Sequence, residues 1–320
     1  MIIFVIMRLL PGDVVGWILS GGGEVVHSPE VREALREELG LNYPLPIQYG
    51  RWLWSILTGE FGGRSLVSSQ PIAAIVSRQL PVTLLLAFYA VVLSVIVSVP
   101  LGILAALRQN GWQDYLVRFI TIPGQALPSF WIALLILLGL TFFFQWSPPI
   151  IYTNPWEDPW NHLKIMVWPV LLLTWEHSSH IARATRAYIL DVMYEDYILT
   201  ARAKGLSQTR IVLRHALRNA LVPTITILGL QLGGLLGGAL ILESIFGLPG
   251  IGRGLVRAAL VRDYPVIQTL VTLLVFTMLT LNFIIDIIYR IIDPRISYSK
   301  STLSRTMDHS VSGNEGITNE

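Results

Sequence analysis

Cysteine is absent from this 320-residue chain, and charged residues make up only 14% of it. Without cysteine there is no disulfide, no thiolate nucleophile and no cysteine-ligated metal. The 6 histidines show no metal-ligand spacing, and the lack of a G-x-x-x-x-G-K-[ST] loop excludes ATP binding by that motif. A formal net charge of +2 is too small to indicate a nucleic-acid partner. No metal site, cofactor or nucleic-acid interface is therefore predicted.

Hydrophobic residues make up 53% of the chain, which is typical of a membrane protein when charged residues are so few. Residues 1–10 are apolar but short, because a spanning helix needs roughly 20 residues. We interpret them as the second half of a transmembrane helix whose beginning is missing. Five longer apolar segments follow, at 81–107, 119–146, 163–181, 221–242 and 266–292. The sequence thus predicts an all-α membrane protein with six transmembrane helices.

These segments divide the chain into four parts. Residues 1–12 are the partial first helix, and 13–79 form an extracytoplasmic helical segment. Residues 80–296 form the transmembrane core, which contains a polar stretch at 194–220. The tail, 297–320, is rich in serine and threonine and cannot bury a core, so it is predicted to be a disordered cytoplasmic tail.

Two helices are predicted within the extracytoplasmic segment. Ser28 is a helix N-cap followed by proline and an acid, and this helix is expected to end at Leu39. Residues 47–61 place aromatic and aliphatic side chains at helical spacing. This amphipathic stretch either lies on the membrane surface or packs as a small cap on the membrane domain.

The positions of lysine and arginine predict the orientation. Loops 108–118 and 183–218 and the C-terminal tail fall on one side of the membrane by alternation, and they are the basic ones. Cytoplasmic loops carry an excess of lysine and arginine. We therefore place these loops and both termini in the cytoplasm, and 13–79 and 147–162 outside. Three cations fall on the outer side and are exceptions to the rule: Arg253, Arg257 and Arg262.

The polar stretch between the third and fourth of the longer segments has a helical pattern. Good helix formers predict a short helix over 196–204. Gly205 is suited to end it in the left-handed conformation, and Ser207 to cap a second helix running to about Leu217. Three arginines then share one face, in contact with lipid phosphates or with a protein: Arg210, Arg214 and Arg218.

Residues 197–223 resemble the cytoplasmic loop of the membrane subunits of binding-protein-dependent ABC importers. The general motif is E-A-A-x-x-x-G followed, nine residues after the Gly, by I-x-L-P. Ala201 and Gly205 match the second Ala and the Gly, and His215 and Leu217 stand at the I and L positions. The departures are Leu199 in place of the Glu, Thr200 in place of the first Ala and Arg218 in place of the Pro.

The variant T-A-R-A-K-G-L with R-H-A-L-R-N-A is similar to the dipeptide/oligopeptide branch, B-type subunit. Other pieces of the pattern occur in order along nearly the whole chain: R-L-L-P-G-D at 8–13, L-G-L at 39–41, G-E-F-G at 59–62, L-P-V-T at 80–83, F-G-L-P-G-I-G at 246–252, R-D-Y-P at 262–265 and D-P-R at 293–295. The resemblance implies the type I importer permease fold.

The resemblance also implies a role for the loop. A short coupling helix would dock in a groove of an ATP-hydrolysing subunit, whose closure would move the attached spans. The chain itself would be no enzyme and carry no catalytic residue. Its partners would be a second homologous permease, two ATPase subunits, an extracytoplasmic binding protein and membrane lipids. The implied coupling residues are Thr200, Ala201, Arg202, Ala203, Lys204, Gly205, His215 and Leu217.

Two features suggest a translocation pathway. Glu176 lies about 20 Å along the third segment, and ionisable groups at such depth are functional by default. It either faces the pathway and meets a peptide's amino group, or pairs with His180 and Arg183 one and two turns further on. Small residues recur every four positions in the next segment, at Gly229, Gly233 and Gly237. Close helix packing is the favoured interpretation of these glycines, and lining the pathway is compatible with it.

Two other functions fit the sequence less well. A proton-coupled secondary transporter would use Glu176 and the histidines, but such proteins often show inverted repeats, and none is visible here. A structural scaffold in a membrane complex would not need the coupling-helix pattern. The family resemblance leaves the substrate open among peptides, nickel complexes, glutathione and oligosaccharides.

Overall fold

The computed structural model describes residues 4–5, 30, 33, 37, 42–149 and 151–292. The described elements are helices, joined by turns that include one isolated β-bridge between Arg64 and Pro71. The predicted tail, 297–320, lies outside the described residues. So does most of the partial first helix and of the predicted helix beginning at Ser28.

Three described helices are long and apolar enough to cross a membrane. They are α5 (Ile72–Leu107), α11 (Leu217–Phe246) and α13 (Tyr264–Ile292). They coincide with predicted segments, although α5 begins nine residues before the expected start and contains Pro81. A further helix, α8 (Pro159–Val192), has 34 residues and is more polar. The all-helical membrane class is thus confirmed, and the number of six spans stays a prediction.

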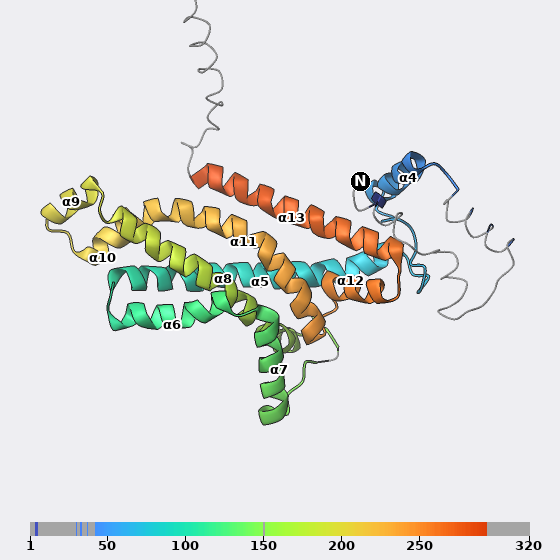
Figure 1. Ribbon diagram of the computed structural model, residues 1–320, viewed down its shortest axis with the longest axis horizontal. Coiled ribbons are helices and arrows are strands. Elements are labelled where there is room, and N and C mark those ends of the chain that lie inside the picture. Colours follow the sequence, from blue (N-terminus) through green and yellow to red (C-terminus); the bar gives the residue numbers. More distant parts are fainter. Residues whose placement is uncertain are drawn as a thin grey trace, which may run out of the picture.

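The predicted segment 119–146 is not one straight helix. Its residues are divided between α6 (Trp112–Ala126), which begins seven residues before the segment, and α7 (Ser129–Phe144), and the two helices are bent by 105° relative to each other. The bend follows from Pro128, because proline disfavours the helical conformation of the residue before it. Leu127 accordingly has an extended backbone, with φ −101° and ψ 134°. As a result α7 projects away from α5, α6 and α8 (Figure 1).

The core lies where α5, α8 and α11 pack together. Leu86 of α5, Leu173 of α8 and Leu242 of α11 are fully buried in one hydrophobic cluster. Gly102 permits close packing of α5 on α8, because a Cβ built there would lie 2.6 Å from Cβ of Thr185. These three helices form the frame that holds the polar loop at one end.

Two shorter helices lie at the opposite end from that loop (Figure 1). The first, α4 (Leu45–Leu57), coincides with the predicted amphipathic stretch, and its Tyr49 and Trp52 pack on Phe4. The second, α12 (Ile251–Leu260), has ten residues and is too short to span a bilayer. The far end from the loop is therefore built from short helices and turns.

Candidate functional site: the polar loop and the helices that carry it

The polar stretch folds into two helices around Gly205. The first, α9 (Asp196–Ala203), ends as predicted, since Gly205 has a positive φ of 79°. The Gly205 N–H donates to the Arg202 carbonyl at 2.9 Å and the Leu206 N–H to the Ala201 carbonyl at 3.4 Å. This pair of bonds is a Schellman motif, in which a left-handed residue satisfies the last helical carbonyls.

The second helix begins at Gln208, as predicted, but differs from the prediction in its cap and in its end. It begins as α10 (Gln208–Ile211), but the Ser207 side chain makes no capping hydrogen bond. The Ser207 carbonyl accepts the first helical hydrogen bond, from the Ile211 N–H at 3.0 Å. The helix does not stop at Leu217 either. It passes through a π-helical turn, η1 (Val212–Ala216), directly into α11.

The inner face of the loop is apolar and packed. Ile198 of α9 is fully buried, and Ala201 is only 8% exposed. They form one cluster with Ile211 and Val212 and with Ile189 of α8. Because Ile198 and Ala201 are three residues apart, they lie on the same face of α9. The loop is therefore a folded unit fixed to two long helices.

The predicted coupling residues divide between two environments. Ala201 faces the protein's own core, so it does not lie on the outer surface of α9. His215 and Leu217 are partly buried where η1 joins α11. The exposed members of the set are Thr200, Arg202, Ala203, Lys204 and Gly205.

Exposed apolar side chains accompany these residues, and the sequence prediction did not include them. Leu199, which replaces the Glu of the general motif, is 50% exposed, and Tyr194 is 78% exposed. Tyr197 has a structural role as well, because its hydroxyl accepts a hydrogen bond from the Asn219 amide at 2.6 Å. This bond ties α9 directly to the first turn of α11. The outer surface of α9 thus combines cations with apolar groups.

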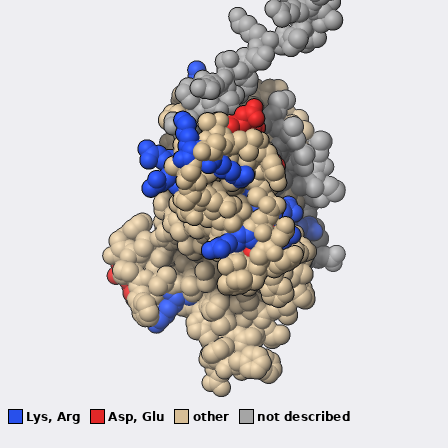
Figure 2. All heavy atoms as spheres, turned by 90° about the vertical axis from the view of Figure 1, so that its left-hand side faces the viewer, with Lys and Arg blue, Asp and Glu red and all other residues tan. Residues whose placement is uncertain are grey.

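Lysine and arginine gather at this end of the molecule, as Figure 2 shows. Arg210 and Arg214 are both exposed, as their spacing of four residues predicts. The side chain of Arg218 lies outside the described part of the structure. Arg186 differs from the exposed cations, because it is engaged in an internal ion pair.

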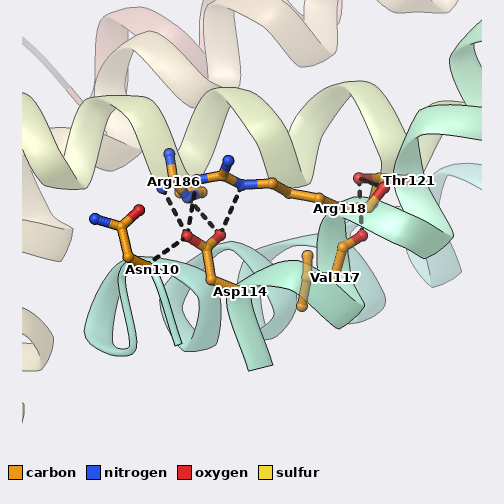
Figure 3. A network of polar contacts seen from close by, with 6 residues as sticks. All are labelled: Asn110, Asp114, Val117, Arg118, Thr121 and Arg186. Atoms are coloured by element: carbon orange, nitrogen blue, oxygen red, sulfur yellow. Dashed lines mark hydrogen bonds and ion pairs between the residues drawn. The ribbon is translucent and has the colours of Figure 1, made fainter. Parts of the chain in front are cut away.

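That ion pair centres on Asp114 at the start of α6 (Figure 3). Asp114 is fully buried, and its carboxylate accepts from Nε of Arg186 at 2.8 Å and from Nη2 of Arg118 at 2.8 Å. The Asn110 N–H donates to it at 3.0 Å. The network joins α6 to α8 directly beneath the polar loop.

Asp114 stays ionised at neutral pH. It lies in the polar residues 108–118, before the apolar part of the bent segment begins. Burial alone would raise its pKa, but the bonds from Arg186, Asn110 and Arg118 outweigh burial and lower the pKa to about 2. In the sequence, Asp114 is the only acid between Arg108 and Arg118, and this position could have identified it.

Glu176 lies in the middle of α8 and is half-buried. Ser129, at the start of α7, lies close enough to interact with its carboxylate, while the buried Oε2 of Glu176 has no hydrogen-bond partner among the described residues. The alternative of a ladder with His180 and Arg183 is wrong, because no ion pair joins Glu176 to either residue in the described structure. The bend at Pro128 brings Ser129 to this carboxylate in place of the ladder.

The three predicted glycines of α11 also lie in two different environments. A Cβ built on Gly229 would lie 2.9 Å from Cγ2 of Ile285, and one on Gly233 would lie 2.7 Å from Cε of Met278. Both glycines therefore permit close packing of α11 on α13. Gly237 is exposed and faces open space, with nothing within 4 Å of a built Cβ.

A buried acid that the sequence prediction missed lies at the far end of α11. Glu243 is fully buried, and it accepts from the Thr83 hydroxyl of α5 and the Gly252 N–H, both at 2.6 Å. The same Thr83 hydroxyl accepts from the Ile251 N–H at 2.9 Å. Glu243 thus fixes α12 against α5 and α11. In the sequence, Glu243 is a lone acid in an apolar run, and this position could have identified it.

A multi-pass helical core that carries a compact basic loop between two long helices defines a class, the membrane transport permeases. The family described as binding-protein-dependent transport system inner membrane component matches residues 98–298, and the chain belongs to this family. This membership confirms the resemblance found in the sequence. The protein is thus a transport component of the membrane.

Two relatives and one solved structure are similar to this chain. A Brucella suis protein provisionally named a peptide transport system permease protein is 39% identical over 295 residues, covering 92% of each chain. The dipeptide transport system permease protein DppB of Alkalihalophilus pseudofirmus is 38% identical over 315 residues, covering 92% of this chain and 93% of that one. The inward-facing MetNI methionine ABC transporter has a similar fold, with a TM-score of 0.58 and 19% identity over 70% of this chain and 99% of that chain.

Proposed function

We propose that the chain is one permease subunit of an ATP-driven ABC importer for peptides or similar small solutes. The observation that carries the proposal is the construction of α9. It is a short helix at the end of the molecule, packed on its inner face and exposed on its outer face. Family membership supports this function and does not favour the alternative of a proton-coupled secondary transporter.

The exposed face of α9 would dock in a groove of an ATPase subunit. Arg202 and Lys204 would pair with acidic groups there, and Ala203 permits close approach. Leu199 adds an apolar contact that strengthens such an interface. The docking surface we propose is therefore the outer face of α9, with Ala201 anchoring it from within.

Movement would pass from α9 into the membrane through rigid contacts. Ile198 and Ala201 pack on α10 and η1, which continue without interruption into α11. The hydrogen bond between Tyr197 and Asn219 makes a second connection. A displacement of α9 on ATP-driven closure of the ATPases would thus move α11 as one body. The π-helical turn lies on this path, and such turns often mark functional sites.

The substrate path would run beside α11 and α8. Gly237 supports this placement, because it leaves open space on an exposed surface. Gly229 and Gly233 contribute by allowing α13 to approach. Glu176 remains a candidate for contact with the amino group of a peptide. The chain would form half of the path and a second homologous permease the other half.

The complete importer would contain this subunit, a second permease, two ATPases and an extracytoplasmic binding protein. It would lie in the cell membrane, with both termini and α9 in the cytoplasm. Arg210 and Arg214 would meet lipid phosphates beside the docking helix. ATP hydrolysis would take place entirely on the partner subunits, so this chain would supply movement and passage alone.

One substitution pair tests the docking surface. Ala203→Trp should release the ATPase subunits from the purified complex, because the bulky side chain prevents close approach of α9. Ala259→Trp is the matched control, since Ala259 is also an exposed helical alanine but lies in α12 at the opposite end. The measurement is the amount of ATPase that co-purifies with each variant. Full retention of the ATPase by Ala203→Trp would contradict the proposal.

A further inference from the structure

A cavity of about 410 Å³ lies between α11 and α13. Its α11 side is lined by Thr226, Gly229, Leu230 and Gly233, and the two glycines leave room because they carry no side chain. Asn282 and Asp286 contribute the polar groups of its α13 side. It is thus a space between two membrane-length helices that contains a carboxylate.

Asp286 is an acid within an apolar helix, α13, that is long enough to cross a membrane. It is exposed, and it lies within the residues of α13 that are apolar enough to cross a membrane. No ion pair joins it to a cation in the described part of the chain, and Arg290, one turn further on, lies beyond ion-pair distance. Ionisable groups in spanning helices face a protein interior or a water-filled cavity, because an unpaired charge in hydrocarbon is costly. The face that carries Asp286 therefore requires water or a counter-cation.

The cavity offers both room and a second polar group. Asn282 stands four residues before Asp286, so the two side chains share one face of α13. Its amide oxygen can accept a hydrogen bond from a cation that the carboxylate attracts. The lining includes one acid and no base. This composition selects a small cation that can donate several hydrogen bonds.

We propose that Asp286 and Asn282 bind the ammonium group of the transported solute, which for a peptide is its amino terminus. This inference rests on the proposed function and names a recognition element within it. Glu176 is less suited to the role, because it is half-buried and has Ser129 close to its carboxylate. Asp286 is both exposed and without a described partner cation. A cation of the second permease subunit is the competing occupant, and the experiment separates the two.

The experiment uses single cysteines, since the native chain has none. Ile285→Cys places a thiol in the cavity lining beside an intact Asp286, within the complete reconstituted transporter. The probes are two methanethiosulfonate reagents of similar size, one with a trimethylammonium group and one with a sulfonate. We expect the cationic reagent to be favoured about tenfold, relative to their ratio with a free thiol in solution, because the carboxylate attracts it. Adding Asp286→Asn should abolish this preference, and Asp286→Glu should restore it.

Protection of the cysteine by added peptides then tests whether the ligand is an ammonium group. Trialanine should slow modification by the cationic reagent, and N-acetyl-trialanine should not, because acetylation removes the ammonium charge. Phe276→Cys is the control, since Phe276 is exposed on α13, lies about 15 Å along the helix from Asp286 and does not line the cavity. Its modification should be independent of Asp286.

Three results would overturn the proposal. If neither reagent modifies Ile285→Cys in the assembled transporter, lipid or the second subunit fills the cavity. A reagent preference unchanged by Asp286→Asn would show that the carboxylate attracts no cation. Equal protection by the free and acetylated peptides would exclude the ammonium group. Co-purification of the ATPases in the same samples tests the proposed function separately. Failure of the proposed function can therefore be distinguished from failure of the proposed ammonium site.

Discussion

At the scale of single residues, Asp114 determines how the polar end of the bundle is held together. It is the one buried acid beneath the loop in the described structure, and it holds two arginines from different helices. Arg118 is 41% exposed at its side chain and Arg186 only 18%. The bond to Arg186 therefore contributes more, since exposure weakens an ion pair.

Replacing Asp114 with Asn is expected to lower the free energy of unfolding by about 2 kcal/mol, because Arg186 loses its counter-ion in a largely buried site. The measurement is thermal unfolding of the purified protein in detergent. Asp191→Asn is the matched control, since Asp191 is an exposed acid on α8. Equal stability of the two variants would contradict the role assigned to Asp114.

The lowered pKa of Asp114 also predicts a pH dependence. The stabilisation by its charge is fully present above the unfolded-state pKa of about 3.9. It is lost as pH falls through the folded-state pKa of about 2. The difference in unfolding free energy between the native protein and Asp114→Asn should therefore stay constant between about pH 5 and pH 8. A difference that disappears within this range would contradict the lowered pKa.

At the scale of helices, the packing of α5 on α8 depends on a glycine. A Cβ on Gly102 would also lie 2.8 Å from the Ala182 carbonyl, a backbone atom that cannot move aside cheaply. Gly102→Ala should destabilise the protein by about 1–3 kcal/mol, as overpacking of a core does. Gly139→Ala in α7 is the control, because nothing lies within 4 Å of its built Cβ. It should be neutral or stabilising, since alanine favours helix. Equal thermal stability of both variants would show that α5 and α8 do not pack closely there.

The sequence predicted where helices lie along the chain better than it predicted which face of each helix is buried. Apolar runs located α5, α11 and α13, because length and hydropathy are local properties. Pro128 was visible within the segment 119–146, but its consequence, a 105° bend, depends on how the two halves pack. Likewise Gly205 could be predicted to end α9 from local conformation alone. Which side of α9 Ala201 would face required knowledge of its tertiary contacts.

The buried polar contacts were the least predictable part of the site. Glu176, His180 and Arg183 stand at helical spacing, which permits a ladder, yet no ion pair joins Glu176 to the other two in the described structure, and Ser129 of another helix lies near its carboxylate. Glu243 contacts Thr83, which is 160 residues away in the chain. Such pairs are determined by the packing of helices distant in sequence, which periodicity does not reveal.

At the scale of the whole molecule, the two ends have different characters. One end carries α9 and α10, and the other carries α4 and α12 (Figure 1). The cations of the α9 end are drawn in Figure 2. The long helices connect the ends, so a contact made at α9 can reach the membrane interior through α11. This arrangement suits a subunit that receives force at one end and admits solute at the other.

The central claim is that this chain works as the permease of an ATP-driven importer. The most direct measurement is uptake of radiolabelled trialanine by proteoliposomes that contain the complete transporter and its binding protein. The account predicts uptake that requires ATP at the α9 side and persists when a protonophore collapses the proton gradient. Uptake driven by a proton gradient without ATP would contradict it.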